Sequence, residues 1–264
     1  MKKLIILSGI AAVLLLSPTA FAGEIKHGMY TPGYQAPDDY VDSGSRWGTT
    51  GGATISYSYS NLLSGLPGGI SAADLRSATE EALMLWATYA PLHFVEEVDS
   101  GPVPSDTAYA AGSHPDLRIG HHYIDGDSGA NVLAHAYYPF STTDGRAGDV
   151  HFDNGNTWRL NLGDPGIDLL EVMVHELGHS LGLGHEPTSG NTAIMNPYYG
   201  SRYSGLGTSF LFQDDINGIR AIYGTGTGSV TPLGTAVPLP AAAWMGLGMM
   251  GVLGVVRRRR RQAA

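Results

Sequence analysis

Residues 175–185, HELGHSLGLGH, give the strongest indication of the fold. His175 and His179 stand four residues apart, so on a helix they share one face and can bind the same metal ion. Gly182 lets the backbone leave the helix in a conformation that side chains disfavour, and the turn returns His185 to the same ion. Three nitrogen ligands leave a fourth coordination position open, which is typical of a catalytic zinc ion and not of a structural one.

Glu176 follows the first of these histidines and supplies the carboxylate that hydrolysis requires. A bound zinc ion lowers the pKa of its water from 15.7 to about 7. We therefore predict that Glu176 is the general base: it takes a proton as water attacks a peptide carbonyl and then delivers it to the leaving amine. No covalent intermediate is needed.

These eleven residues resemble the signature of the metzincin metallopeptidases. The segment AIMNP, residues 193–197, resembles their Met-turn, in which Met195 forms a hydrophobic floor beneath the zinc ion. Three further segments resemble the matrixin branch of this class: VLAHA (132–136), GDVHFD (148–153) and QDDINGI (213–219).

The likeness spans residues 46–224 and implies both a fold and a reaction. The implied fold is α/β: a twisted, mostly parallel five-stranded sheet with two long helices and a small C-terminal subdomain. The implied activity is that of a zinc metalloendopeptidase, whose protein or peptide substrate lies extended along an edge strand. Pro197 and Tyr198 match the segment that lines the S1′ pocket of the family, which implies a preference for an apolar side chain after the scissile bond.

Matrixins also carry a structural zinc ion held by three histidines and one aspartate. By motif, His135 and His151 match two of these ligands. We predict His122 and Asp125, from the short loop before VLAHA, as the other two. The alternative is that His135 and His151 only hydrogen-bond to each other across the sheet.

Calcium is implied by the same resemblance, because hard carboxylate and carbonyl oxygens suit Ca²⁺. Asp116 and Asp149 match one family site. Asp127 and Asp153 match another, with Asn156 standing where a carboxylate is expected. The alternative for each of these aspartates is a solvated turn residue.

Hydrophobic periodicity and turn residues predict the regular elements around the zinc motif. Ser71 is the predicted N-cap of a long helix that ends before Pro91. We expect strands at 53–60, 117–120 and 132–137, and helices at 166–183 and 213–223.

The two ends of the chain are predicted to be targeting signals and not parts of the folded domain. Residues 1–22 have the charged start, apolar run and A-x-A site of a secretory signal peptide, the alternative being an uncleaved membrane anchor. Residues 23–45 are predicted to be a leader or short pro-segment. Residues 225–236, rich in Gly and Thr, are predicted to be a linker.

The C-terminal residues 237–261 resemble the PEP-CTERM sorting tail of Gram-negative bacteria. A VPLP motif is followed by an apolar stretch, residues 241–256, and then by five arginines. This resemblance implies a transient membrane anchor, recognition by membrane sorting and processing machinery, and a final location in the envelope, at the cell surface or in the extracellular matrix. The alternative is a plain tail anchor.

Composition limits the remaining function classes. The chain has no cysteine, so disulfides and thiolate chemistry are excluded, as is a matrixin cysteine switch. Seven of the 15 Lys and Arg lie at the chain ends, which leaves eight against 24 acids. An acidic body repels phosphate backbones, so we expect no nucleic-acid partner, and we expect a monomer.

Two rival functions remain open at this point. One is a non-catalytic surface or matrix protein that keeps the metal-stabilised fold. The other is a zinc amidase that acts on cell-wall peptides.

Overall fold

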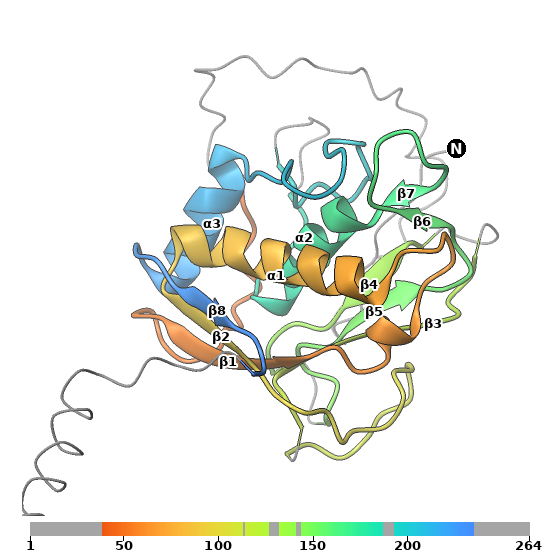
Figure 1. The fold of residues 1–264 in the computed structure, drawn as a ribbon. Coiled ribbons are helices and arrows are strands. Elements are labelled where there is room, and N and C mark those ends of the chain that lie inside the picture. Colours follow the sequence, from red (N-terminus) through yellow and green to blue (C-terminus); the bar gives the residue numbers. More distant parts are fainter. Residues whose placement is uncertain (1–38, 113, 127–131, 141–143, 187–192, 235–264) are drawn as a thin grey trace, which may run out of the picture. The chain divides into compact units, whose positions relative to one another are not determined.

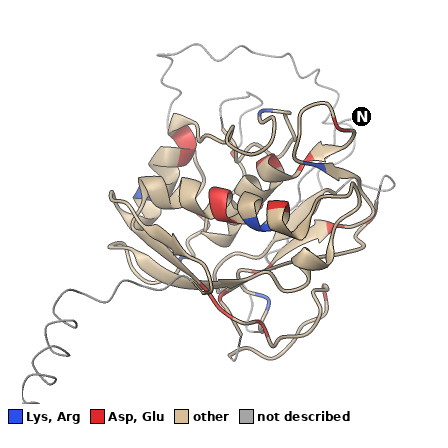
Figure 2. Cartoon of the chain, in the orientation of Figure 1, with Lys and Arg blue, Asp and Glu red and all other residues tan. Residues whose placement is uncertain are grey.

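The computed structural model describes residues 39–112, 114–126, 132–140, 144–186 and 193–234 (Figure 1). The predicted signal peptide and sorting tail lie outside the described residues. Within the described part of the chain, no helix has both the length and the apolar character of a membrane span. Figure 2 shows few basic residues among the described ones, in keeping with the acidic body seen in the sequence.

A six-stranded sheet runs through the body in the order β4-β5-β3-β1-β2-β8. All neighbouring strands pair parallel except β4 and β5, which are antiparallel. The strands are β1 (Ala53–Ser58), β2 (Leu92–Glu96), β3 (Leu117–His122), β4 (Ala134–Ala136), β5 (Val150–Asp153) and β8 (Ser229–Thr231), and a separate two-stranded sheet consists of β6 (Trp158–Arg159) and β7 (Ile167–Asp168). The mostly parallel α/β fold is confirmed.

The strand count and the linker prediction need correction. The sixth strand, β8, lies inside residues 225–236, which the composition indicated to be a linker. An edge strand needs only its backbone N–H and C=O groups to pair, so a Gly- and Ser-rich stretch can form one without an apolar signature. Gly228 approaches the carbonyl of Leu92 so closely that a Cβ at this position would overlap it.

Three helices cover one face of the large sheet (Figure 1). They are α1 (Ala72–Tyr89), α2 (Leu169–Ser180) and α3 (Gln213–Tyr223), and a 3₁₀ turn, η2 (Leu62–Ser64), precedes α1. The predicted cap of α1 is confirmed, because the Ser71 side chain accepts a hydrogen bond from the backbone N–H of Asp74. Asp168 caps α2 in the same way, through the N–H groups of Leu170 and Glu171.

Helix α2, which carries the zinc motif, is enclosed on all sides. All of its twelve residues are buried. The apolar face of α1 packs against it, and the indole N–H of Trp86 donates a hydrogen bond to the carbonyl of Val174 at 3.0 Å. The core therefore sits between α1 and the sheet, and it holds α2 in a water-poor environment.

The end of the predicted leader is part of this body. The backbone N–H of Ser43 donates to the carbonyl of Gly182 at 2.9 Å, and the N–H of Gly184 donates to the carbonyl of Val41 at 2.6 Å. The N–H of Asp39 donates to the side chain of Asp214 on α3. Residues 39–45 thus form a strap over the turn that follows α2.

Replacing Trp86 by phenylalanine tests this packing. The change removes the hydrogen bond to Val174 and part of a fully buried ring, so we expect the free energy of unfolding to fall by about 1–3 kcal/mol. Urea unfolding of the two proteins measures the change. Met84→Leu, at an exposed position of the same helix, is the control and should change stability by less than about 0.5 kcal/mol. Equal stability of W86F and the parent would contradict this account.

Candidate metal centres and active site

His175, His179 and His185 converge at the end of α2. One nitrogen from each ring lies within 4.8 Å of the other two, and the Nε2 atoms of His175 and His185 are 3.3 Å apart. The ring of His179 stands edge-on to both of its neighbours. The structure thus brings together the three ligands that the motif indicated.

Backbone carbonyls fix the orientation of two of these rings. The Nδ1 atom of His175 lies 2.7 Å from the carbonyl oxygen of Ile194, and Nδ1 of His179 lies 2.7 Å from that of Leu183. A carbonyl only accepts, so Nδ1 of each ring carries the proton and Nε2 keeps its lone pair.

The residues fit a zinc ion. Nε2 of His179 is buried and has no hydrogen-bond partner in the described part of the chain. Burial lowers the pKa of His175 and of His179 well below the ordinary value, and it lowers that of His185 to about 4. All three rings are therefore neutral at pH 7, which is the form that coordinates zinc.

Glu176 follows His175 in α2, the helix that carries the first two histidines. Both of its carboxylate oxygens are buried and lack a hydrogen-bond partner among the described residues. Burial raises the pKa of Glu176 well above the usual range, so this carboxylate takes up a proton more readily than a solvated one does. This is the property that a general base requires.

Met195 packs directly against the zinc-motif helix. Its sulfur lies so close to Gly178 that a Cβ at that position would overlap it, and the ring of Trp86 closes the same space. Met195 is 3% exposed. The structure therefore places Met195 against the helix that carries the first two histidines.

Asp215 holds this turn in place, and the sequence reasoning assigned it no role. Its buried carboxylate accepts backbone hydrogen bonds from Ile194, Met195 and Phe212. Burial raises the pKa of Asp215 to about 7 although these bonds oppose the change. The signal available in the sequence was an acidic residue inside the QDDINGI segment.

A buried ion pair fixes the segment that follows the Met-turn. Glu171, one turn before the first histidine of α2, pairs with Arg202 at 2.8 Å and accepts the N–H groups of Gly200 and Tyr203. The guanidinium of Arg202 also donates to the carbonyl of Tyr198. The half-buried residues 197 and 198, predicted to line S1′, are thereby tied to the zinc-motif helix.

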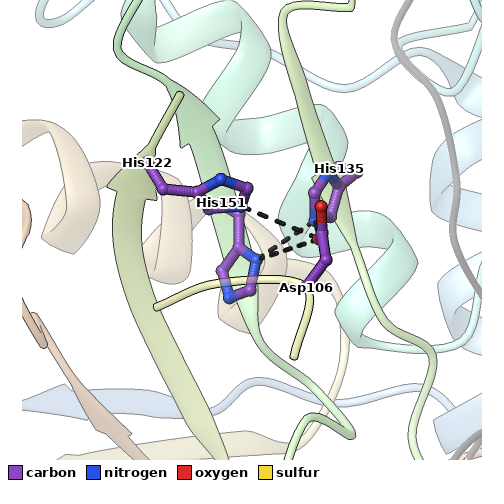
Figure 3. Close-up of side chains that lie close together, drawn as sticks. All are labelled: Asp106, His122, His135 and His151. Carbon is purple, nitrogen blue, oxygen red and sulfur yellow. Dashed lines mark hydrogen bonds and ion pairs between the residues drawn. The ribbon is translucent and has the colours of Figure 1, made fainter. Parts of the chain in front are cut away.

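A second cluster joins Asp106, His122, His135 and His151 (Figure 3). An Asp106 oxygen lies 3.0 Å from Nε2 of His135, which is 3.1 Å from Nδ1 of His151. Nε2 of His122 is buried, has no hydrogen-bond partner in the described chain and lies 3.7 Å from the same carboxylate. Three imidazoles and one carboxylate within 4.8 Å of one another fit a four-coordinate zinc ion.

The fourth ligand differs from the predicted one. Asp125 accepts the backbone N–H of Val132 at 3.1 Å and is not a member of the cluster. Asp106 takes that place, from the long segment between β2 and β3. His135 bonds to Asp106, and this bond helps to lower the pKa of the aspartate to about 2, so it is ionised at neutral pH.

The two aspartates of the first predicted calcium site have different partners. Asp116 accepts hydrogen bonds from the backbone N–H and the hydroxyl of Ser56, both at 2.9 Å. Asp149 accepts the hydroxyl of Tyr109 at 2.6 Å, and the guanidinium of Arg118 lies 3.7 Å away. Arg118 is fully buried, so it already supplies a positive charge next to Asp149. The calcium role of Asp116 and Asp149 stays a prediction.

Arg118 also fastens the segment between β2 and β3. Its Nε donates to Asp99 at 2.9 Å, and its Nη2 donates to the carbonyl of Pro102. With Asp106 at the second metal centre and Tyr109 on Asp149, this segment is held at three separate places.

The other predicted calcium residues stay predictions. Asp153 accepts N–H groups from Ile124, Gly126 and Gly155, and from the side-chain amide of Asn156. Asp127 lies outside the described residues. The structure shows that Asp153 organises the loop after β3, and it shows no cluster of three carboxylates or histidines at this place among the described residues.

A helix that carries two histidines and a glutamate, followed by a glycine turn that returns a third histidine above a methionine, defines the metzincin class of metallopeptidases. The family model for matrixin, peptidase M10, matches residues 46–224. The chain belongs to the matrixin family, whose members use catalytic and structural zinc and calcium.

Several vertebrate proteins resemble the chain. The interstitial collagenase of Equus caballus is 36% identical over 198 residues, which is 75% of this chain and 37% of that protein. The neutrophil collagenase of Homo sapiens is 36% identical over 171 residues, 65% of this chain and 33% of that protein. Stromelysin-1 of Mus musculus is 39% identical over 153 residues, 58% and 29% of the two chains. The chain spans about a third of the length of these relatives.

The second metal centre gives a direct prediction about zinc content. Asp106→Ala removes one of four ligands, so we expect the bound zinc to fall from two ions per chain towards one. Asp125→Ala is the matched control and should keep both ions. Metal analysis after dialysis measures the two numbers. Loss of zinc in D125A together with full zinc in D106A would reverse the assignment.

Asp215→Asn tests the support of the Met-turn. The amide keeps the size of the side chain but replaces one acceptor oxygen by a donor that faces backbone N–H groups. We expect a loss of about 2–3 kcal/mol in the free energy of unfolding. Chemical denaturation measures it, and a loss below about 0.5 kcal/mol would show that Asp215 does not hold the turn.

Proposed function

We propose that the protein is an exported zinc-dependent endopeptidase that hydrolyses peptide bonds within protein chains. The observation that supports this most directly is the buried carboxylate of Glu176, which has no hydrogen-bond partner in the described chain and directly follows His175, the first of three converging histidines. A site that served only to stabilise the fold would have no use for a carboxylate kept unsatisfied at this position, because burying it costs free energy.

The residues of the chain divide the work of hydrolysis. His175, His179 and His185 would hold zinc, which when bound polarises the substrate carbonyl and makes water acidic near neutral pH. Glu176 takes the proton from the attacking water and returns it to the leaving amine. The buried position of the glutamate keeps its basicity high throughout.

The edge strand β4 offers the place for an extended substrate. It ends the sheet order, and among the described strands it pairs with β5 alone. A peptide chain can add to the other edge through backbone hydrogen bonds. Residues 197 and 198, held by the pair of Glu171 and Arg202, would form the opposite wall and favour an apolar side chain after the scissile bond.

The ends of the chain support export. The signal-peptide pattern of residues 1–22 and the sorting-tail pattern of residues 237–261 together indicate delivery across the inner membrane of a Gram-negative cell and transient anchoring there by residues 241–256. Substrates would then be proteins of the envelope, the cell surface or the extracellular matrix, and the chain would act as a monomer.

Glu176→Ala is the experiment that tests the proposal. Removal of the general base should lower kcat/KM for a protein substrate by at least about 10³-fold, and zinc content should stay at the wild-type value. Cleavage of casein and of a peptide library, with parallel metal analysis, measures both. Addition of a zinc chelator to the wild-type protein should abolish cleavage as well.

Two outcomes would favour the rivals. A wild-type protein with its full zinc content that cleaves no peptide in the library would support a non-catalytic surface protein. Cleavage of cell-wall peptides in the absence of cleavage of casein would support a zinc amidase.

A further inference from the structure

Tyr138 lies on the active-site side of the segment that continues β4. Side chains alternate along an extended strand. His135 and Tyr137 point to the second metal centre, where the ring of Tyr137 lies 5.7 Å from that of His135 and 5.9 Å from that of His151. Tyr138 faces the other way, towards α2, and no role was assigned to it from the sequence.

Three observations place the phenol among the parts of the zinc motif. The ring of Tyr138 stands at 87° to the ring of His179, with 5.9 Å between their centres. Its hydroxyl oxygen lies 3.5 Å from the position that a Cβ of Gly184 would take, next to His185. The charge of the Glu176 carboxylate also contributes to raising the pKa of this hydroxyl, after burial.

The ring is only partly buried, so Tyr138 is not simply a member of the core. It follows the end of β4, the edge strand along which the proposed function places the substrate. Burial and the carboxylate of Glu176 both raise the pKa of the Tyr138 hydroxyl, so it is protonated at neutral pH and can donate one hydrogen bond.

We propose that Tyr138 is a catalytic residue that donates a hydrogen bond from its hydroxyl to the carbonyl oxygen of the scissile peptide bond as negative charge develops there. This inference rests on the proposed endopeptidase function. A preorganised donor in a water-poor site stabilises such charge more than it stabilises the neutral substrate, so it acts on kcat and hardly on KM.

Tyr138→Phe removes only the hydroxyl oxygen and keeps the ring against His179. We expect kcat to fall by about 10²-fold, the usual effect of removing one oxyanion donor, with KM within about twofold of wild type. Zinc content and melting temperature should not change. Tyr89→Phe, at the far end of α1, is the matched control and should keep wild-type kcat.

A second measurement separates catalysis from substrate binding. A phosphonamidate peptide mimics the charged tetrahedral centre, so its affinity should fall in Y138F by about the same factor as kcat/KM. The affinity of an ordinary substrate peptide for Glu176→Ala protein should be the same with and without the Tyr138→Phe change.

The outcomes are distinguishable from those of the proposed function. If the wild-type protein cleaves no peptide, the endopeptidase function itself fails. If it cleaves and Y138F has an unchanged kcat, or loses activity together with zinc or folding, or shows only a raised KM, then the role of Tyr138 is overturned and the endopeptidase function stands.

Discussion

The exclusion of water from α2 is the constraint on which the site depends. The helix is buried along its whole length, and this burial keeps the histidines neutral and the glutamate basic. Each of these groups is costly to bury without a partner, so the packing around α2 favours the binding of a metal ion by the histidines. The packing around α2 therefore determines both the stability of the fold and the affinity of the site for a metal ion.

The supports of this helix come from distant parts of the chain. Residues 39–45 bind the turn after it, Trp86 of α1 bonds to its backbone, and Asp215 of α3 holds the methionine beneath it. A hydrogen bond in a water-poor interior is expensive to leave unmade, so each support is specific in geometry as well as stabilising. These contacts fix the positions of the metal ligands, which catalysis by positioned groups requires.

Local spacing explains what could be predicted from the sequence and what could not. His175, His179 and His185 follow from helix periodicity and one glycine, and the matrixin segments extended that reading to His135 and His151. The role of Asp106 as a ligand could not be predicted, because it reaches the second metal centre from a segment with no periodic pattern. Only the packing of that segment against β3 brings it there. The strand β8 could not be predicted, because its composition is that of a linker and its pairing with β2 depends on backbone groups alone.

The guanidinium of Arg118 gives the region around β3 a positive charge that does not depend on a bound ion. A divalent ion exchanges with the surroundings, and acidic polysaccharides or dilution can remove it. A cation that is covalently part of the chain has no dissociation constant and needs no supply from outside. Beside Asp149, the positive charge of Arg118 is therefore present wherever the folded protein is, whatever ions the surrounding medium contains.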